Sequence, residues 1–271
     1  MDKGIIRVLR SEQHHGNFWI LTTENEVKAA QLTLQHKNGN YANPPSPLPK
    51  GLAVESFSLP AHPLLQTPKT KILFLAANPA GTNHLALDKE CREIEQKIRS
   101  SEHRDRFEFV TTWAVRTGDL LQYLNQHRAH VIHFSGHGSP SEELILLDAN
   151  DQAKTVSKAA LKQLFTTLKD NIRVVVLNAC FSRPQAEAIT EVIDCAIGMN
   201  RAIGDEAAIV FAAHFYQALG FGHSVRKAFD SGKTALMLEG IAEENIPRLL
   251  VRKGVDPNAI FLIEPIKEAS L

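Results

Sequence analysis

Short apolar runs alternate with amphipathic stretches along most of this chain. Strand-like segments recur from residue 71 onwards, at 71–77, 107–113, 129–136, 172–180 and 195–199. Several of them are continuous apolar runs, which are typical of strands that are covered on both faces. Helical patterns lie between and after them, at 85–100, 116–127, 157–170, 184–192, 205–220 and 224–240. This alternation predicts a mostly parallel sheet with helices on both faces, and we expect a late strand at 258–264.

The first 65 residues have a different pattern. Short β-like segments occur at 5–9, 18–23 and 27–34. The stretch NPPSPLPKG, residues 43–51, holds four prolines, which favour an extended and semi-rigid segment. We therefore predict a small β-rich N-terminal appendage with a proline-rich linker at 1–65, and a main domain at 70–271.

The composition narrows the range of partners and compartments. Thirty Lys and Arg balance thirty Asp and Glu, whereas a nucleic-acid binder usually shows a basic excess, so we exclude nucleic acid as the main partner. Three cysteines do not make a disulfide framework and suggest a reducing compartment. No apolar run reaches the roughly 18 residues that a membrane span needs, and the N-terminus lacks a secretory signal. We expect a cytoplasmic protein that does not engage a membrane.

Two neighbouring predicted strands end in residues that suit nucleophilic chemistry. One runs into HFSGHGSP, residues 133–140, where His137 stands between two glycines, and the next ends in NACFS with Cys180. One crossover helix joins them, and sites in open α/β sheets lie at the carboxyl ends of strands. We therefore expect His137 and Cys180 to meet at one edge of the sheet. A thiolate can attack a carbonyl there while the imidazole manages its proton.

The glycines around His137 fit the same interpretation. Gly136 would let the chain turn out of the strand, and Gly138 would let a substrate carbonyl approach the backbone closely. The N–H groups of Gly138 and Cys180 could then form an oxyanion hole. We interpret His133 as a hydrogen-bonded strand histidine, because a metal site would need a third ligand and a different spacing. No metal and no cofactor is expected.

These residues resemble the CHAT family of caspase-like peptidases, which belong to the clan of caspases, separases, legumains and gingipains. The paired motifs HFSGHG and VVVLNACFS carry the resemblance, which covers about residues 70–265. It implies a caspase-like three-layer αβα sandwich and a cysteine endopeptidase that needs no cofactor. The implied dyad is His137 and Cys180, with the backbone of Gly138 and Cys180 as oxyanion donors, and the implied partner is a protein substrate.

The resemblance also suggests where a substrate binds. An extended peptide would pair along the strand after the cysteine, at Ile197, Gly198 and Met199. A basic residue at P1, just before the scissile bond, would need an acidic residue, for which the candidates are Asp194 and Asp205. An acidic P1 residue would need a basic one, for which the candidates are Arg183 and Arg201. The sequence leaves this choice open.

The sequence also suggests how the domain could be regulated and which other functions it could have. Many CHAT domains are governed by attached or partner sensor modules in bacterial stress response or phage defence, so residues 1–65 are a candidate docking element. The same cleft could instead capture an extended peptide by strand addition without using the dyad, which would make the domain a binding module. A different thiol chemistry such as acyl transfer is a third reading. A peptidase would lose activity on Cys180→Ala, whereas a binding module would bind peptide equally well.

Overall fold

The computed structural model describes residues 7–8, 20–21 and 68–263. Contacts divide the chain into two units, Met1–Gln66 and Thr67–Leu271. In the first unit, β1 (Arg7–Val8) pairs antiparallel with β2 (Ile20–Leu21), and each strand lies inside a predicted β-like segment. The expected strand at 27–34 and the proline-rich stretch at 43–51 lie outside the described residues.

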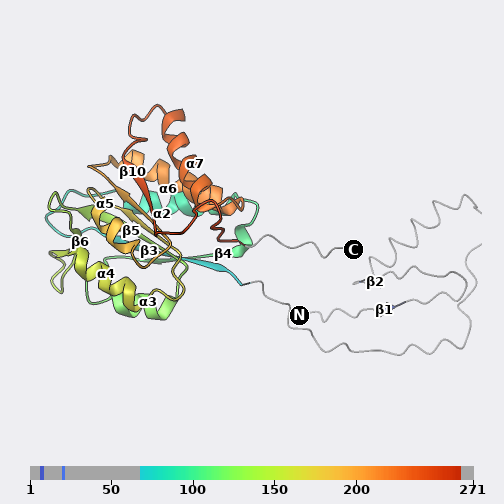
Figure 1. The fold of residues 1–271 in the computed structure, drawn as a ribbon, viewed down its shortest axis with the longest axis horizontal. Helices are drawn as coiled ribbons and strands as arrows, with labels where there is room; N and C mark the ends of the chain where they lie inside the picture. Colours follow the sequence, from blue (N-terminus) through green and yellow to red (C-terminus); the bar gives the residue numbers. More distant parts are fainter. Residues whose placement is uncertain (1–6, 9–19, 22–67, 264–271) are drawn as a thin grey trace, which may run out of the picture. The chain divides into compact units, whose positions relative to one another are not determined.

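An eight-stranded sheet forms the centre of the second unit (Figure 1). Its main path runs β10 (Pro247–Val251), β9 (Cys195–Met199), β8 (Val174–Asn178), β5 (Val131–Gly138), β3 (Thr70–Ala77) and β4 (Phe107–Thr112). All neighbours on this path are parallel except β10, which is antiparallel to β9. A hairpin of β6 (Leu144–Leu147) and β7 (Ala153–Val156) joins the end of β5. The predicted mostly parallel sheet is confirmed.

Helices cover both faces of this sheet. One face packs against α2 (Leu87–Arg99), α6 (Asp205–Gly220) and α7 (Val225–Leu238), and the other against α3 (Leu120–His127), α4 (Lys158–Thr167) and α5 (Arg183–Ile189) (Figure 1). A single 3₁₀ turn, Arg104–Arg106, precedes β4. Ser157 and Ser224 cap α4 and α7 by accepting a backbone N–H three residues on. The expected three-layer αβα fold is therefore confirmed.

Residues of the central strands divide between two cores. In β3, Ile72 and Phe74 belong to the core under α2, α6 and α7, whereas Leu73 and Leu75 belong to the core under α3, α4 and α5. All four side chains are at most 2% exposed. Successive residues of a strand point to opposite faces, so both sets must be apolar. This explains the continuous apolar runs in the sequence.

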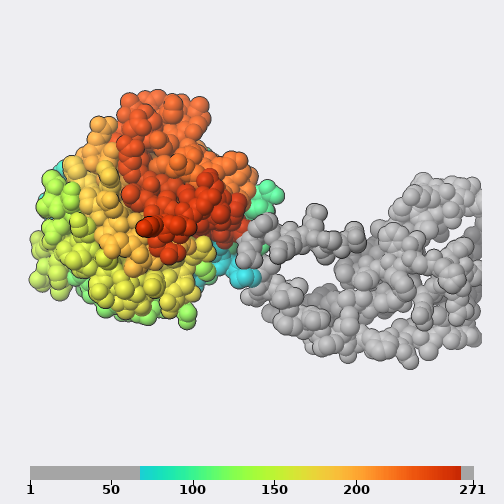
Figure 2. Space-filling view, in the orientation of Figure 1, coloured from blue at the N-terminus to red at the C-terminus, as the bar shows by residue number. Residues whose placement is uncertain are grey.

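The predicted strand at 258–264 is wrong. Ile260 and Ile263 are buried in the core, but the described part of that segment, 258–263, forms no strand. The last strand is β10, an edge strand that is mostly half-buried and therefore has no continuous apolar run to reveal it. Figure 2 shows the C-terminal part of the chain, coloured orange to red, gathered on one side of the unit.

Gly232 provides a test of the packing between α6 and α7. A Cβ at this position would lie 2.8 Å from the carbonyl oxygen of Phe211 and 2.8 Å from its Cδ2. Gly→Ala inside a helix normally stabilises by about 0.5–1 kcal/mol, but here we expect overpacking to reverse the sign. Gly232→Ala should lower the free energy of unfolding by about 1–3 kcal/mol in urea denaturation.

Thr234→Ala is the matched control, because Thr234 lies in the same helix with an exposed side chain. Its effect should stay within about 0.5 kcal/mol. A gain in stability from Gly232→Ala would contradict the close approach of the two helices.

Candidate active site

The register of β5 and β8 brings the two residues of the predicted dyad to the same end of the sheet. Ser135 of β5 lies opposite Asn178 of β8 in the parallel ladder. His137 and Cys180 each follow two residues later, at the carboxyl end of their strand. The structure therefore places these two residues at the same edge of the sheet. Both are partly exposed there, whereas Ser135 and Asn178 are buried.

The backbone of Gly138 lies directly against that of Cys180. A Cβ on Gly138 would lie 1.9 Å from the carbonyl oxygen of Cys180 and 3.3 Å from its nitrogen. No side chain fits into this space, so only glycine is compatible with the contact. From the sequence, a glycine at position 138 was expected to allow the approach of a substrate carbonyl. The structure gives another reason for this glycine: the loops that carry His137 and Cys180 pack backbone to backbone.

A strained turn follows Cys180. Phe181 has a φ of 55°. This is in the left-handed region, which residues other than glycine, asparagine and aspartate seldom adopt. Its N–H donates to the carbonyl of Arg201 at 3.3 Å. Ser182, the next residue, is held on two sides. Its hydroxyl donates to the carbonyl of Leu177 at 2.8 Å and accepts the N–H of Met199 at 2.9 Å. The turn thus holds Cys180 at the rim of the sheet.

The loop after β3 determines which nitrogen of His137 carries the proton. Nε2 of His137 lies 3.2 Å from Oδ1 of Asn78 and 3.0 Å from the hydroxyl of Thr82. The amide of Asn78 is oriented by Leu85, whose carbonyl accepts from Nδ2 and whose N–H donates to Oδ1. The hydroxyl of Thr82 donates to the carbonyl of Pro79. Since Oδ1 can only accept, Nε2 is the protonated nitrogen and Nδ1 keeps its lone pair.

The environment of His137 favours the neutral imidazole. Burial lowers the pKa of His137, and the backbone of Asn83 and the charge of Asp205 oppose this only in part. A neutral ring with a free lone pair at Nδ1 can accept a proton. The role of Thr82 was not foreseen from the sequence.

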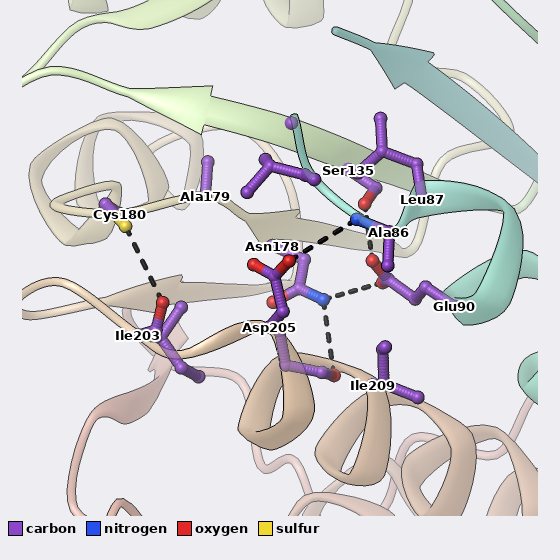
Figure 3. Close-up of a pocket in the computed structure, with 13 residues that line it drawn as sticks. Ala86, Leu87, Glu90, Ser135, Asn178, Ala179, Cys180, Ile203, Asp205 and Ile209 are labelled. Carbon is purple, nitrogen blue, oxygen red and sulfur yellow. Dashed lines mark hydrogen bonds between the residues drawn. The ribbon is translucent and has the colours of Figure 1, made fainter. Parts of the chain in front are cut away.

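A pocket opens beside Cys180, between the loop before α2, the ends of β5 and β8, and the start of α6 (Figure 3). Its apolar walls are Leu85, Leu87, Ile203 and Ile209. The thiol of Cys180 lies 3.9 Å from the carbonyl oxygen of Ile203. Two acidic residues, Asp205 and Glu90, also line the pocket, and none of its lining residues is basic. The pocket is thus an apolar slot with acidic groups.

Asp205 and Asp194, the two acidic candidates for substrate binding, lie at opposite ends of the sheet. Asp205 lines the pocket, and its carboxylate accepts the N–H of Ala86 at 3.4 Å. Asp194 precedes β9 and accepts from Arg173 and Arg252, at 2.6 Å each. Burial opposes ionisation of Asp194, but the two guanidinium groups outweigh it and lower its pKa. The structure therefore gives Asp194 a different environment, away from the pocket.

The segment expected to pair with an extended substrate is closed on both sides. Strand β9 lies between β8 and β10, and Ile197, Gly198 and Met199 are buried. Gly198 and Met199 lie opposite Arg248 and Pro247 of β10. A Cβ on Gly198 would lie 2.7 Å from the carbonyl oxygen of Ser182. The β10 ladder occupies one edge of all three residues, and on the other side Ile197 pairs with β8 and the N–H of Met199 donates to Ser182. An extended substrate could pair here only by displacing these contacts.

The comparisons with known proteins agree with this fold. The CHAT domain profile matches residues 53–243, and the chain therefore belongs to the CHAT family. A "Probable protease" from Gillisia limnaea is 27% identical over 154 residues, which cover 56% of this chain and 27% of the relative. A "Roc-COR-CHAT protease" from an unknown prokaryotic organism is 30% identical over 166 residues, covering 56% of this chain and 16% of the relative. The matched part is thus less than a third of either relative.

The Arg-specific cysteine proteinase gingipain R (RgpB) is similar in fold. The TM-score is 0.50 at 11% sequence identity, and the match covers 72% of this chain and 50% of that chain. This similarity supports the caspase-like fold. In the part of the chain that the structure describes, no helix is long and apolar enough to cross a membrane. Within the same residues, no group of three or more His, Cys, Asp or Glu side chains could hold a metal ion.

The three cysteines should differ sharply in reactivity. Burial raises the pKa of Cys91 to about 11 and that of Cys195 to about 12, and neighbouring acidic residues add to both effects. Both thiols are buried, whereas Cys180 is partly exposed. Since the thiolate is the reactive species, iodoacetamide near neutral pH should label Cys180 at least about ten-fold faster than the other two. Peptide mass spectrometry after timed quenching measures the three rates.

Cys180→Ser serves as the control, because it should remove the fast label and leave the slow ones. Labelling of Cys91 or Cys195 at the rate of Cys180 in the folded protein would contradict the burial of these two thiols.

Proposed function

We propose that this chain is a cysteine endopeptidase with Cys180 as the nucleophile and His137 as the general acid–base residue. One observation carries the proposal: His137 and Cys180 each follow two residues after the last pair of β5 and β8, and Nε2 of His137 is hydrogen-bonded to Asn78, which leaves Nδ1 as the proposed basic nitrogen. Membership of the CHAT family and the protease names of the relatives support the same reaction class.

The proposed reaction follows from this arrangement. Nδ1 of His137 takes the thiol proton, and the sulfur of Cys180 attacks the carbonyl carbon of the scissile bond. The N–H groups of Gly138 and Cys180 are proposed to stabilise the resulting oxyanion. His137 then returns its proton to the leaving amine as the C–N bond breaks, which leaves a thioester. Water, losing a proton to His137, hydrolyses the thioester, and the proton returns to sulfur.

We infer further that the pocket selects a basic residue at P1. Leu85, Ile203 and Ile209 would pack against the aliphatic part of a lysine or arginine, and the carboxylate of Asp205 would meet its charge. The alternative, an acidic P1 residue, would need a basic residue in the pocket. Neither Arg183 nor Arg201 lines it, and both are exposed.

Regulation by another module is part of the proposal. Both relatives are several times longer than the matched segment, so in those proteins the protease segment is one part of a larger chain. We propose that a partner or an attached sensor controls the activity of this domain, with residues 1–65 as a docking element. A role in bacterial stress or defence rests on the family resemblance.

Cleavage profiling tests the peptidase proposal. Wild type and Cys180→Ala are incubated with a mixed peptide library, with and without cell lysate, and new termini are identified by mass spectrometry. We expect wild type to cut after Lys or Arg and Cys180→Ala to lose at least about 10³-fold in rate, because the nucleophile is missing. Peptide binding without cleavage, equal in both proteins under every condition, would instead support the binding module.

Asp205→Asn tests the assignment of the P1 pocket. For a matched pair of peptides with arginine or its neutral analogue citrulline at P1, the preference in kcat/KM for arginine should fall about ten-fold. The negative charge of Asp205 raises the pKa of His137, so the acidic limb of the pH profile should also move to lower pH in this variant.

Asp194→Asn is the matched control, since Asp194 lies at the other end of β9. It should lower stability by about 1–2 kcal/mol through the loss of its arginine contacts, and leave the preference for arginine unchanged. An unchanged preference in Asp205→Asn, or an equal loss in Asp194→Asn, would rule out Asp205 as the P1 partner.

A further inference from the structure

A buried carboxylate lies beneath the two strand ends that carry the dyad. Glu90, on α2, is only 3% exposed and accepts three hydrogen bonds. Its Oε1 accepts from Nδ2 of Asn178 at 2.6 Å, and its Oε2 accepts from the hydroxyl of Ser135 (Figure 3). Oε1 also accepts from Nε2 of His133 at 2.8 Å. A buried charge is stable only when donors of this kind surround it.

Tyr216 and Phe74 complete the surroundings of His133 in this network. Burial raises the pKa of Tyr216 well above its usual value, and the charge of Glu90 raises it further. Tyr216 therefore keeps its proton, and its hydroxyl lies 3.1 Å from Nδ1 of His133, within hydrogen-bond distance. On the other side of the ring, Nε2 of His133 donates to the carboxylate of Glu90. The ring of Phe74 stacks on His133, with centroids 5.0 Å apart, and fixes its plane.

The position of these hydrogen bonds in the ladder is the central observation. Ser135 and Asn178 form the last paired residues of β5 and β8. Beyond them β5 pairs with β6 instead, and β8 ends. His137 and Cys180 thus lie past the point where the ladder holds these two strands together. One carboxylate joins both strands at that last pair through side chains.

We propose that Glu90 is a positioning residue that sets the separation of His137 and Cys180 by joining Ser135 to Asn178. Glu90 also lines the pocket, but both of its oxygens are occupied, so it acts through the strands and not on a substrate. The catalytic part of this inference rests on the proposed function, whereas the geometric part does not. A misplacement of about 1 Å can reduce the rate of a positioned reaction by about 10²-fold.

The test uses the rate at which iodoacetamide alkylates Cys180, because this rate needs no substrate. We compare wild type with Glu90→Gln, which places an amide among donors, and with Ser135→Ala, which removes one arm of the clamp with little change in volume. Ile94→Ala is the control for stability alone, since Ile94 is buried one turn further along α2 and takes no part in the network.

We expect Glu90→Gln and Ser135→Ala to slow alkylation of Cys180 about ten-fold or more, well below the melting temperature of each variant. With a cleavable peptide, kcat should fall by about 10–100-fold while KM stays within about two-fold. Ile94→Ala should lower the melting temperature and leave the alkylation rate as in wild type.

The proposal is overturned if Glu90→Gln and Ser135→Ala lose stability but keep the wild-type alkylation rate, as the control does. If Glu90→Gln does not fold, Ser135→Ala decides by the same criterion. If wild type cleaves no peptide while alkylation still slows in both variants, the positioning role stands and the peptidase proposal fails.

Discussion

The parallel pairing of β5 with β8 is the constraint on which the site depends. Because the two strands run in the same direction and in a fixed register, residues at equal distances beyond their last pair arrive at the same place. Three further features of the candidate site depend on these two strands. Gly138 packs on the backbone of Cys180, Glu90 joins the strands from α2, and the β6–β7 hairpin pairs with the end of β5. The helices on both faces bury the strands and so keep the register unique.

The loop after β3 determines the tautomer of His137, which a histidine side chain does not fix by itself. An imidazole has two nitrogens and can carry its proton on either, so its use as a base depends on what fixes the tautomer. Asn78 does this here, and its own orientation is fixed by the backbone of Leu85. Strand β3, whose loop carries Asn78, is therefore as much a part of the candidate site as β5 and β8.

The sequence predicted those parts of the fold that depend on burial on both faces. The central strands followed from apolar runs, and the rule that sites lie at carboxyl ends predicted that His137 and Cys180 lie at the same end of the sheet. Edge strand β10 and the β6–β7 hairpin were missed, because strands at an edge or in a short hairpin need no long apolar run. The network of Glu90 could not be predicted, since it depends on which side of α2 faces the sheet and on contacts 43 to 88 residues apart.

Strand direction could have separated two candidates that the sequence left equal. Asp194 comes before β9 and Asp205 after it, so a parallel strand places them at opposite edges. The residues of β9 were expected to pair with a substrate because of the family resemblance. An added strand needs a free edge, and β10 occupies one edge of β9. Strand β10, which the sequence pattern does not reveal, therefore changes the interpretation of β9.

The contact between Gly138 and Cys180 involves only main-chain atoms on both sides. The shape of the two loops is therefore independent of the side chain at position 180. A protein whose sulfur has been removed keeps the same cleft, the same pocket and the same backbone donors. Under the proposed function, such a protein would serve as a substrate trap that binds a protein partner without cleaving it.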